Sequence, residues 1–287
     1  MKRVSRIRIK EDIDRRYLGA ICIVDSVTNG IVRRSLDIEA KGLCFVINRS
    51  YLHVIVSAEN LENHLRSFVA PPDHPEIRSN IFQLTISDPL RHYLPRIKYI
   101  ELPRNPNPKV QDALFEPIRI PMFSAVSRGS RPNWSIIRVS VYNVGKEDSE
   151  VPIKGALIRI VREDDEKLIA AGLADPRGEA MIIIPGIPLH SVVTEDERPV
   201  DEDEPDHEDR PTSGDVVEKE TSVKLFVVVD KKLPWPVDPE LLEEKSHEWL
   251  CKVKYNRSNE LKNNIKLKLK TGQTQKITLF VKVPDGT

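Results

Sequence analysis

The chain has 287 residues, which suggests two domains at the usual size of about 150 residues each. Its 44 basic and 44 acidic side chains cancel, so the chain lacks the overall positive charge of a nucleic-acid coat. No apolar run reaches the roughly 18 residues that span a bilayer, and the N-terminus lacks the apolar stretch of a signal peptide. We therefore expect a soluble, unprocessed protein that binds no nucleic acid and has no membrane span.

Short stretches rich in β-branched and aromatic residues alternate with turn residues along most of the chain. This pattern is typical of the strands of β-sandwich folds. Because the chain has 22 prolines, long uninterrupted helices are not expected. Strands are predicted over residues 18–24, 43–47, 51–56, 81–86, 136–142, 156–161, 181–184, 223–229 and 277–283.

The first part of the chain has clear turn signals. Residues 25–32 are predicted to form a hairpin, because Asn29-Gly30 suits a tight turn. Residues 35–40 alternate like a strand, and residues 48–50 form a turn before the next strand. The pattern fits a first β-sandwich, with an unrelated β-meander as the alternative.

The middle of the chain contains a basic segment and a proline-rich one. Residues 91–104 interleave basic and aromatic side chains, as single-strand nucleic-acid binders do. Their prolines and alternating Leu and Ile favour instead an edge strand with a basic outer face. Residues 103–108 are predicted to link the two domains, since a Pro/Asn string cannot sustain a central strand. Residues 114–123 are expected along a sheet edge of the second domain.

One segment has the signals of a helix. Asp238 can cap its first turn, and Pro239 suits the first helical position. The sequence therefore predicts a short helix over residues 238–250, with Trp249 in the core. Its inner face would be formed by Leu241, Leu242, Lys245, Trp249 and Leu250.

Charge is distributed in blocks, with +8 over residues 1–140, −15 over 141–250 and +7 over 251–287. Residues 195–209 carry ten carboxylates, with Arg198 as their only cation. Like-charge repulsion predicts a disordered acidic insertion here, within residues 190–222. A docking or cation-binding role is the alternative, although the spacing of an EF-hand is absent.

Three cysteines, Cys22, Cys44 and Cys251, form no C-x-x-C motif. We expect Cys22 and Cys44 to be small buried apolar residues in a reducing compartment. A disulfide between these two is the alternative.

The sequence shows no catalytic constellation. The motifs G-x-S-x-G and H-E-x-x-H, the P-loop and the dinucleotide fingerprint do not occur. The seven histidines, among them His64 and His74, lack the spacing of metal ligands. The carboxylates lie in turns and in the acidic insertion, where nothing would shift their pKa for acid–base work. We therefore predict that the protein is not an enzyme and has no catalytic residue, cofactor or metal.

Binding residues are predicted in three places. The basic segment over residues 91–104 offers phenol and guanidinium groups for binding. Two tryptophans lie beside prolines at strand ends, where such residues either close one end of a sandwich or form an exposed interface with a partner protein. The last basic stretch, residues 265–270, alternates lysine with apolar residues, which protects an edge strand or meets the acidic insertion of a neighbouring subunit. The candidate interaction residues are Tyr93, Arg96, Arg104, Trp134, Trp235, Lys266, Lys268 and Lys270.

Residues 151–186 follow a recognisable pattern. Pro152-Ile-Lys-Gly155-Ala156 begins a strand, Ala174-Asp175-Pro-Arg-Gly178 forms a turn, and the following apolar strand ends at Pro185-Gly186. This pattern resembles the carboxypeptidase-regulatory-like, transthyretin-like domains, over about a quarter of the chain. Ala174 replaces their common Thr, and the acidic insertion after Pro188 is a further departure.

These observations predict an all-β fold of two β-sandwich (Ig/transthyretin-like) domains with one short helix and a disordered acidic insertion. The expected division is an N-terminal β-sandwich over 1–103, a proline-rich linker and edge segment over 104–133, and a carboxypeptidase-regulatory-like β-sandwich over 134–287.

The combination of a basic first domain, the segment around Tyr93 and Arg104 and this second domain resembles proteins encoded with phage-tail-like contractile injection systems. The resemblance implies a non-enzymatic structural subunit, either a cap or tail-terminator protein or a baseplate accessory. Its partners would be tube, sheath or cap proteins within a cytoplasmic particle. It would form a homo-oligomer such as a ring of six, with edge strands adding to neighbouring subunits. The alternative is a soluble carbohydrate- or protein-binding module.

Overall fold

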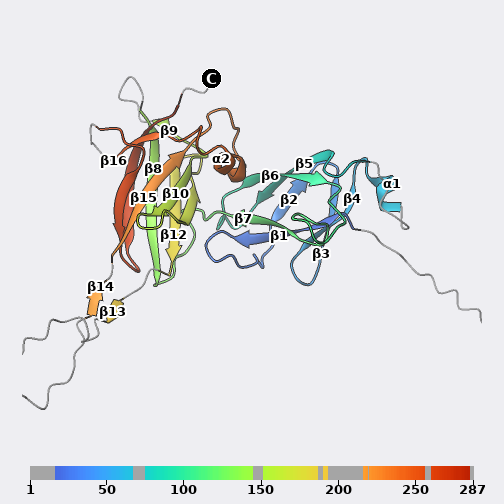
Figure 1. Ribbon diagram of the computed structural model, residues 1–287, viewed down its shortest axis with the longest axis horizontal. Helices are drawn as coiled ribbons and strands as arrows, with labels where there is room; N and C mark the ends of the chain where they lie inside the picture. Colours follow the sequence, from blue (N-terminus) through green and yellow to red (C-terminus); the bar gives the residue numbers. More distant parts are fainter. Residues whose placement is uncertain are drawn as a thin grey trace, which may run out of the picture.

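The computed structural model describes residues 17–66, 75–144, 151–186, 190–192, 216–218, 220–255 and 260–284. The described strands form two bodies, one built from sheets within residues 19–122 and one from sheets within residues 134–282 (Figure 1). The all-β fold class predicted from the sequence is confirmed.

The first body is a sandwich of two sheets. One sheet has the order β3-β4-β1-β7 and the other the order β2-β5-β6. A short helix, α1 (Glu62–Arg66), follows β4 and was not expected from the sequence. The strands are β1 (Gly19–Asp25), β2 (Asp37–Ala40), β3 (Leu43–Ile47), β4 (His53–Ala58), β5 (Asn80–Ser87), β6 (Arg96–Leu102) and β7 (Ile118–Met122).

The core of the first sandwich is formed by alternate apolar residues of both sheets. Ile21 and Ile55 of one sheet face Leu84 and Ile100 of the other, and each is at most 3% exposed. Period-two alternation places these residues on one face of each strand, as the sequence pattern requires.

The second body is also a sandwich of two sheets, ordered β12-β8-β18-β16 and β11-β10-β15-β17, with β9 paired to the end of β8. β8 and β18 run parallel, while the other pairs are antiparallel. The strands are β8 (Trp134–Asn143), β9 (Val151–Pro152), β10 (Leu157–Arg162), β11 (Leu168–Leu173), β12 (Glu179–Pro185), β15 (Thr221–Val228), β16 (Lys252–Tyr255), β17 (Ile265–Leu269) and β18 (Thr274–Lys282).

The turn between β11 and β12 is the one predicted at residues 175–178. The Asp175 carboxylate accepts hydrogen bonds from the backbone N–H groups of Arg177 (2.8 Å) and Glu179 (3.0 Å). Gly178 has a φ of +75°, and a Cβ atom there would lie 2.6 Å from the carbonyl oxygen of Val141. Only glycine fits this position without displacing the backbone of β8.

The linker predicted at residues 103–108 and the second-domain edge predicted at residues 114–123 both belong to the first sandwich. Residues 103–108 form part of a loop that stays with the first sandwich, because the strand that follows them, β7, pairs in parallel with β1. Residues 118–122 therefore complete the first sandwich, and their expected place on the second domain is wrong. The chain crosses to the second sandwich only after β7, within residues 123–133.

The predicted helix is present but shorter than residues 238–250. α2 spans Pro239–Glu244, and the Asp238 side chain caps it by accepting the N–H of Glu240 at 3.1 Å. Its expected extension to residue 250 is wrong, because Trp249 and Cys251 pair with the end of β15. The Val229 N–H donates to the Trp249 carbonyl at 3.2 Å, and the Cys251 N–H donates to that of Val227 at 2.9 Å.

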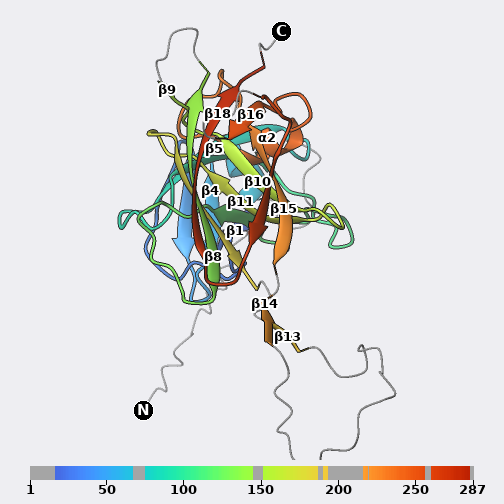
Figure 2. The same ribbon diagram turned by 90° about the vertical axis from the view of Figure 1, so that its left-hand side faces the viewer.

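Two further strands, β13 (His190–Val192) and β14 (Val216–Glu218), pair antiparallel at the base of the acidic insertion. They project from one end of the second sandwich (Figure 1, Figure 2). The acidic residues 195–209 lie outside the described residues.

Candidate functional site: interdomain polar clusters and a free strand edge

The two sandwiches are joined by apolar and ionic contacts. One apolar cluster places Leu94 of the first sandwich and Phe123, directly after β7, against Leu157, Val237 and Leu242 of the second. α2 lies between the two bodies beside β6 (Figure 1). The Ile97 N–H of β6 donates to the Val237 carbonyl at 3.0 Å, so the segment leading into α2 covers this sheet edge.

Arg96 forms the most deeply buried ionic contact between the sandwiches. Its guanidinium lies 2.9 Å from the carboxylate of Asp238 and 3.2 Å from that of Glu240, and the side chains of Arg96 and Asp238 are 1% and 3% exposed. Arg96 also donates to the Pro121 carbonyl at 2.6 Å. Burial lowers the pKa of Arg96 to about 10, although the Asp238 carboxylate opposes this, so the group stays charged at neutral pH. Lys98 adds a second ion pair to Glu240.

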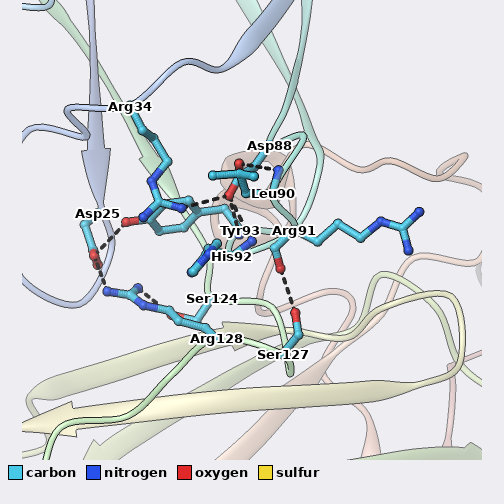
Figure 3. A network of polar contacts seen from close by, with 10 residues as sticks. All are labelled: Asp25, Arg34, Asp88, Leu90, Arg91, His92, Tyr93, Ser124, Ser127 and Arg128. Atoms are coloured by element: carbon cyan, nitrogen blue, oxygen red, sulfur yellow. Dashed lines mark hydrogen bonds and ion pairs between the residues drawn. The ribbon is translucent and has the colours of Figure 1, made fainter.

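A second polar cluster lies where β1 ends (Figure 3). The Asp25 carboxylate accepts a hydrogen bond from the Tyr93 hydroxyl, with 2.9 Å between the two oxygens, and forms an ion pair with the guanidinium of Arg128. Burial raises the pKa of Tyr93 to about 12, with the Asp25 charge acting in the same direction. Burial alone would raise the pKa of Asp25, but Arg128 and the N–H of Val27 lower it below its ordinary value.

Asp88 organises the loop on the other side of Tyr93. Its carboxylate accepts hydrogen bonds from the N–H groups of Leu90 (3.0 Å), His92 (2.9 Å) and Tyr93 (3.2 Å) (Figure 3). Arg34 approaches the same carboxylate at 3.5 Å. The loop is thereby held in the position that presents Tyr93 to Asp25.

Arg128 extends this cluster to the second sandwich. Its guanidinium lies over the Tyr93 ring at 5.1 Å and over the Trp134 ring at 5.4 Å. Trp134 is the first residue of β8, and Arg131 covers its ring as well, at 5.0 Å. Because Arg128 lies in the crossing segment, one side chain joins both sandwiches by ionic and cation–π contacts.

The predicted interaction residues fall into two groups. Tyr93, Arg96, Arg104 and Trp134 are between 1% and 7% exposed, so the expectation of a basic outer face on β6 is wrong. Trp235 is half-buried and packs on the apolar cluster between the sandwiches. Tyr93, Arg96, Trp134 and Trp235 lie at or near the junction, where strand alternation turns Arg96 inward, toward α2. Arg104 lies elsewhere in the first sandwich, where it donates to the Glu116 carbonyl and lies 3.9 Å from the carboxylate of Asp112.

Lys266 and Lys268 of β17 are exposed, and Lys270, which follows the strand, is half-buried. Lys266 pairs with Glu163, while Lys268 and Lys270 lie 3.0 and 3.7 Å from the carboxylate of Glu220. Exposed pairs of this kind contribute little stability. They show that partners within the chain are available to these lysines. Of the two roles expected from the sequence, the edge strand agrees with the place of β17 at the end of its sheet, and contact with the acidic insertion of a neighbour stays a prediction.

The three cysteines are free thiols, and the alternative of a Cys22–Cys44 disulfide is wrong. Cys22 and Cys251 are buried, whereas Cys44 is exposed on β3, contrary to expectation. Burial raises the pKa of the Cys251 thiol to about 12. We expect a thiol reagent to modify one cysteine of the native protein and three after unfolding, as an absorbance titration would measure. Rapid modification of all three native thiols would contradict this burial.

β3 is a free sheet edge. Within the described residues it pairs only with β4, and three of its five side chains are exposed, with Val46 at 55% and Ile47 at 59%. The other edge strands of the first sandwich are protected from pairing with another chain. β2 carries Asp37 and Glu39, β7 contains Pro121, and the Ile97 N–H of β6 already donates to the Val237 carbonyl. Unpaired apolar edges are templates for pairing with another chain, whereas charges and prolines prevent it.

Sequence reasoning missed Asp25, Asp88 and Arg128. Asp25 and Asp88 each precede a turn, and this is a signal for a carboxylate that accepts backbone N–H groups. The partners of these carboxylates cannot be deduced in the same way, because Tyr93 and Arg128 lie 68 and 103 residues from Asp25.

In the part of the chain that the structure describes, no group of three His, Cys, Asp or Glu side chains is placed to hold a metal ion. Neither described helix is long and apolar enough to cross a membrane.

The described structure is therefore an all-β protein, and its two sandwiches are joined by the buried polar contacts of Arg96 and Arg128. No family model and no curated protein matches the chain. Among solved structures, it is similar to the Bacillus anthracis TIE protein with a TM-score of 0.26 and 10% identity, over 93% of this chain and 34% of that chain. The chain spans about a third of that protein's length, and a similarity this weak supports no argument about fold or function.

Proposed function

We propose that this protein is a non-enzymatic structural subunit of a larger protein assembly. The observation that carries the proposal is the free, apolar edge of β3 on a body whose two sandwiches are joined by the buried Arg96–Asp238 ion pair and by the Arg128–Trp134 cation–π contact. A fixed body with an open edge suits a subunit that joins neighbours by strand addition.

The polar clusters support a structural role. The carboxylates of Asp25, Asp88 and Asp238 are each occupied by backbone N–H groups and by a guanidinium. Their partners come from separate strands and loops, so the clusters use buried charge to hold distant segments together. This arrangement is typical of networks that specify a single packing.

The assembly that the sequence resembles is a phage-tail-like contractile injection particle, and we propose a cap or baseplate position within it. The alternative, a carbohydrate- or protein-binding module, needs an aromatic platform on the surface. Trp134 is 5% exposed and Trp235 packs between the sandwiches, so the described structure gives that alternative less support.

The test is sedimentation of the native protein from a gentle lysate of its source cells, with Val46→Lys as the variant. We expect wild type in a megadalton-sized fraction and the variant outside it, because a lysine on the edge opposes strand addition. Ile81→Lys is the matched control, since Ile81 is 66% exposed but lies on β5 of the opposite sheet, away from the β3 edge, where it pairs with Glu101 of β6. Wild type found only as a monomer or dimer would refute the proposal.

A further inference from the structure

We propose that the occupant of the β3 edge is a second copy of this chain, paired antiparallel to β3 about a two-fold axis. This inference rests on the proposed function, because both use β3 as an assembly surface. It goes further by naming the partner strand and its direction.

The side chains of β3 allow two copies of this strand to pair with each other. Leu43, Cys44, Phe45, Val46 and Ile47 contain no charged side chain and no proline. Two such edges pair without burying a charge, and each covers the exposed apolar side chains of the other. Cross-strand pairs of apolar residues each contribute roughly 0.2–1 kcal/mol.

The two ends of β3 differ in charge in a way that favours the antiparallel direction. Exposed Glu39 and Glu59 flank the turn that begins β3, together with Lys41, which leaves this end with a net negative charge. Exposed Arg49 follows the other end. Antiparallel pairing brings the negative end of each copy to Arg49 of the other, whereas parallel pairing would place like charges together.

The same charges select a register. With Phe45 on the axis, Arg49 would lie opposite Lys41 of the second copy, and two cations would meet. With Val46 on the axis, Arg49 lies opposite Leu43, next to the Gly42–Glu59 pair of the second copy. In that register Val46 meets its own counterpart, and exposed Ile47 lies opposite Phe45. The geometry therefore points to a two-fold axis at Val46.

The inference is tested on purified full-length protein by sedimentation velocity and by cross-linking. We expect wild type to sediment with the mass of two chains, and Val46→Lys to raise the dimer dissociation constant by about tenfold or more. Ile81→Lys should leave it unchanged. In a Cys44→Ser background, Val46→Cys should form disulfide-linked dimers under mild oxidation, because a residue on the axis faces itself. Ile81→Cys in the same background should not.

Each outcome decides between the two proposals. A monomeric wild type, or a dimer that Val46→Lys does not weaken, overturns the second copy as occupant. If Val46→Lys then still leaves the megadalton-sized fraction of the lysate, the proposed function stands and β3 binds a different subunit. A cross-linkable dimer that never enters a large fraction supports the inference and overturns the proposed function.

Discussion

Replacing Arg96 by methionine is expected to lower the free energy of unfolding by about 3–5 kcal/mol. The substitution keeps most of the side-chain volume but leaves the carboxylate of Asp238, 3% exposed, without its cation. The carbonyl of Pro121 also loses a donor. Because a buried unpaired charge costs more than the pair contributes, the loss should exceed that of any surface pair in the protein. Chemical denaturation monitored by tryptophan fluorescence would measure it.

The double variant Arg96→Met with Asp238→Asn separates the charge from the packing. It removes both charges while the asparagine oxygen can still cap α2 at Glu240. We expect it to recover at least half of the loss, since no uncompensated charge remains. A double variant as unstable as Arg96→Met alone would show that the lost volume and shape, and not the stranded carboxylate, cause the effect.

The strands of both sandwiches could be predicted because the sequence signals for a strand lie within a few neighbouring residues. Residues 43–47 have the same bounds in the pattern and in β3, and most of the other predicted strands overlap observed ones closely. The same holds for the cap of α2, where Asp238 and Pro239 are adjacent in sequence. Alternation, turn residues and caps act over a few positions, so a single chain displays them.

The site residues were harder to predict because their partners are distant. Arg96 alternates with Ile97 and Lys98 as an exposed basic residue would, yet its partner Asp238 lies 142 residues away. Periodicity indicates which side chains share a strand face but does not show what covers that face. The parallel β1–β7 pair was missed for the same reason, since it joins segments about 97 residues apart, counted from Ile21 to Ile118.

The two ionic clusters act at different points of the same junction. Arg96 ties β6 to the cap of α2, and Arg128 ties the end of β1 to the start of β8. Two separated contacts oppose rotation of one sandwich against the other more strongly than a single one. A fixed angle between the sandwiches is what a subunit needs if its free edge is to meet a neighbour in one orientation.

Replacing Arg128 by methionine is expected to lower the free energy of unfolding by about 2–3 kcal/mol near neutral pH. Asp25, whose side chain is 9% exposed in wild type, loses its cation, and the Tyr93 and Trp134 rings lose a cation–π partner. Arg131→Met is the matched control, because Arg131 covers the same Trp134 ring from an exposed position. Its effect should stay below about 1 kcal/mol.

The pH dependence of the Arg128→Met effect identifies its source. In wild type the pKa of Asp25 is lowered from 3.8, so the stability it contributes is present above that value and is lost as the pH falls through the lower, folded pKa. In the variant, burial without the cation raises the pKa of Asp25, and protonation at acid pH relieves the unpaired charge. The difference between wild type and variant should therefore be largest near neutral pH and should narrow as the pH falls toward and below 3.8. A difference that stays constant over this range in denaturant titrations would show that Asp25 is not its source.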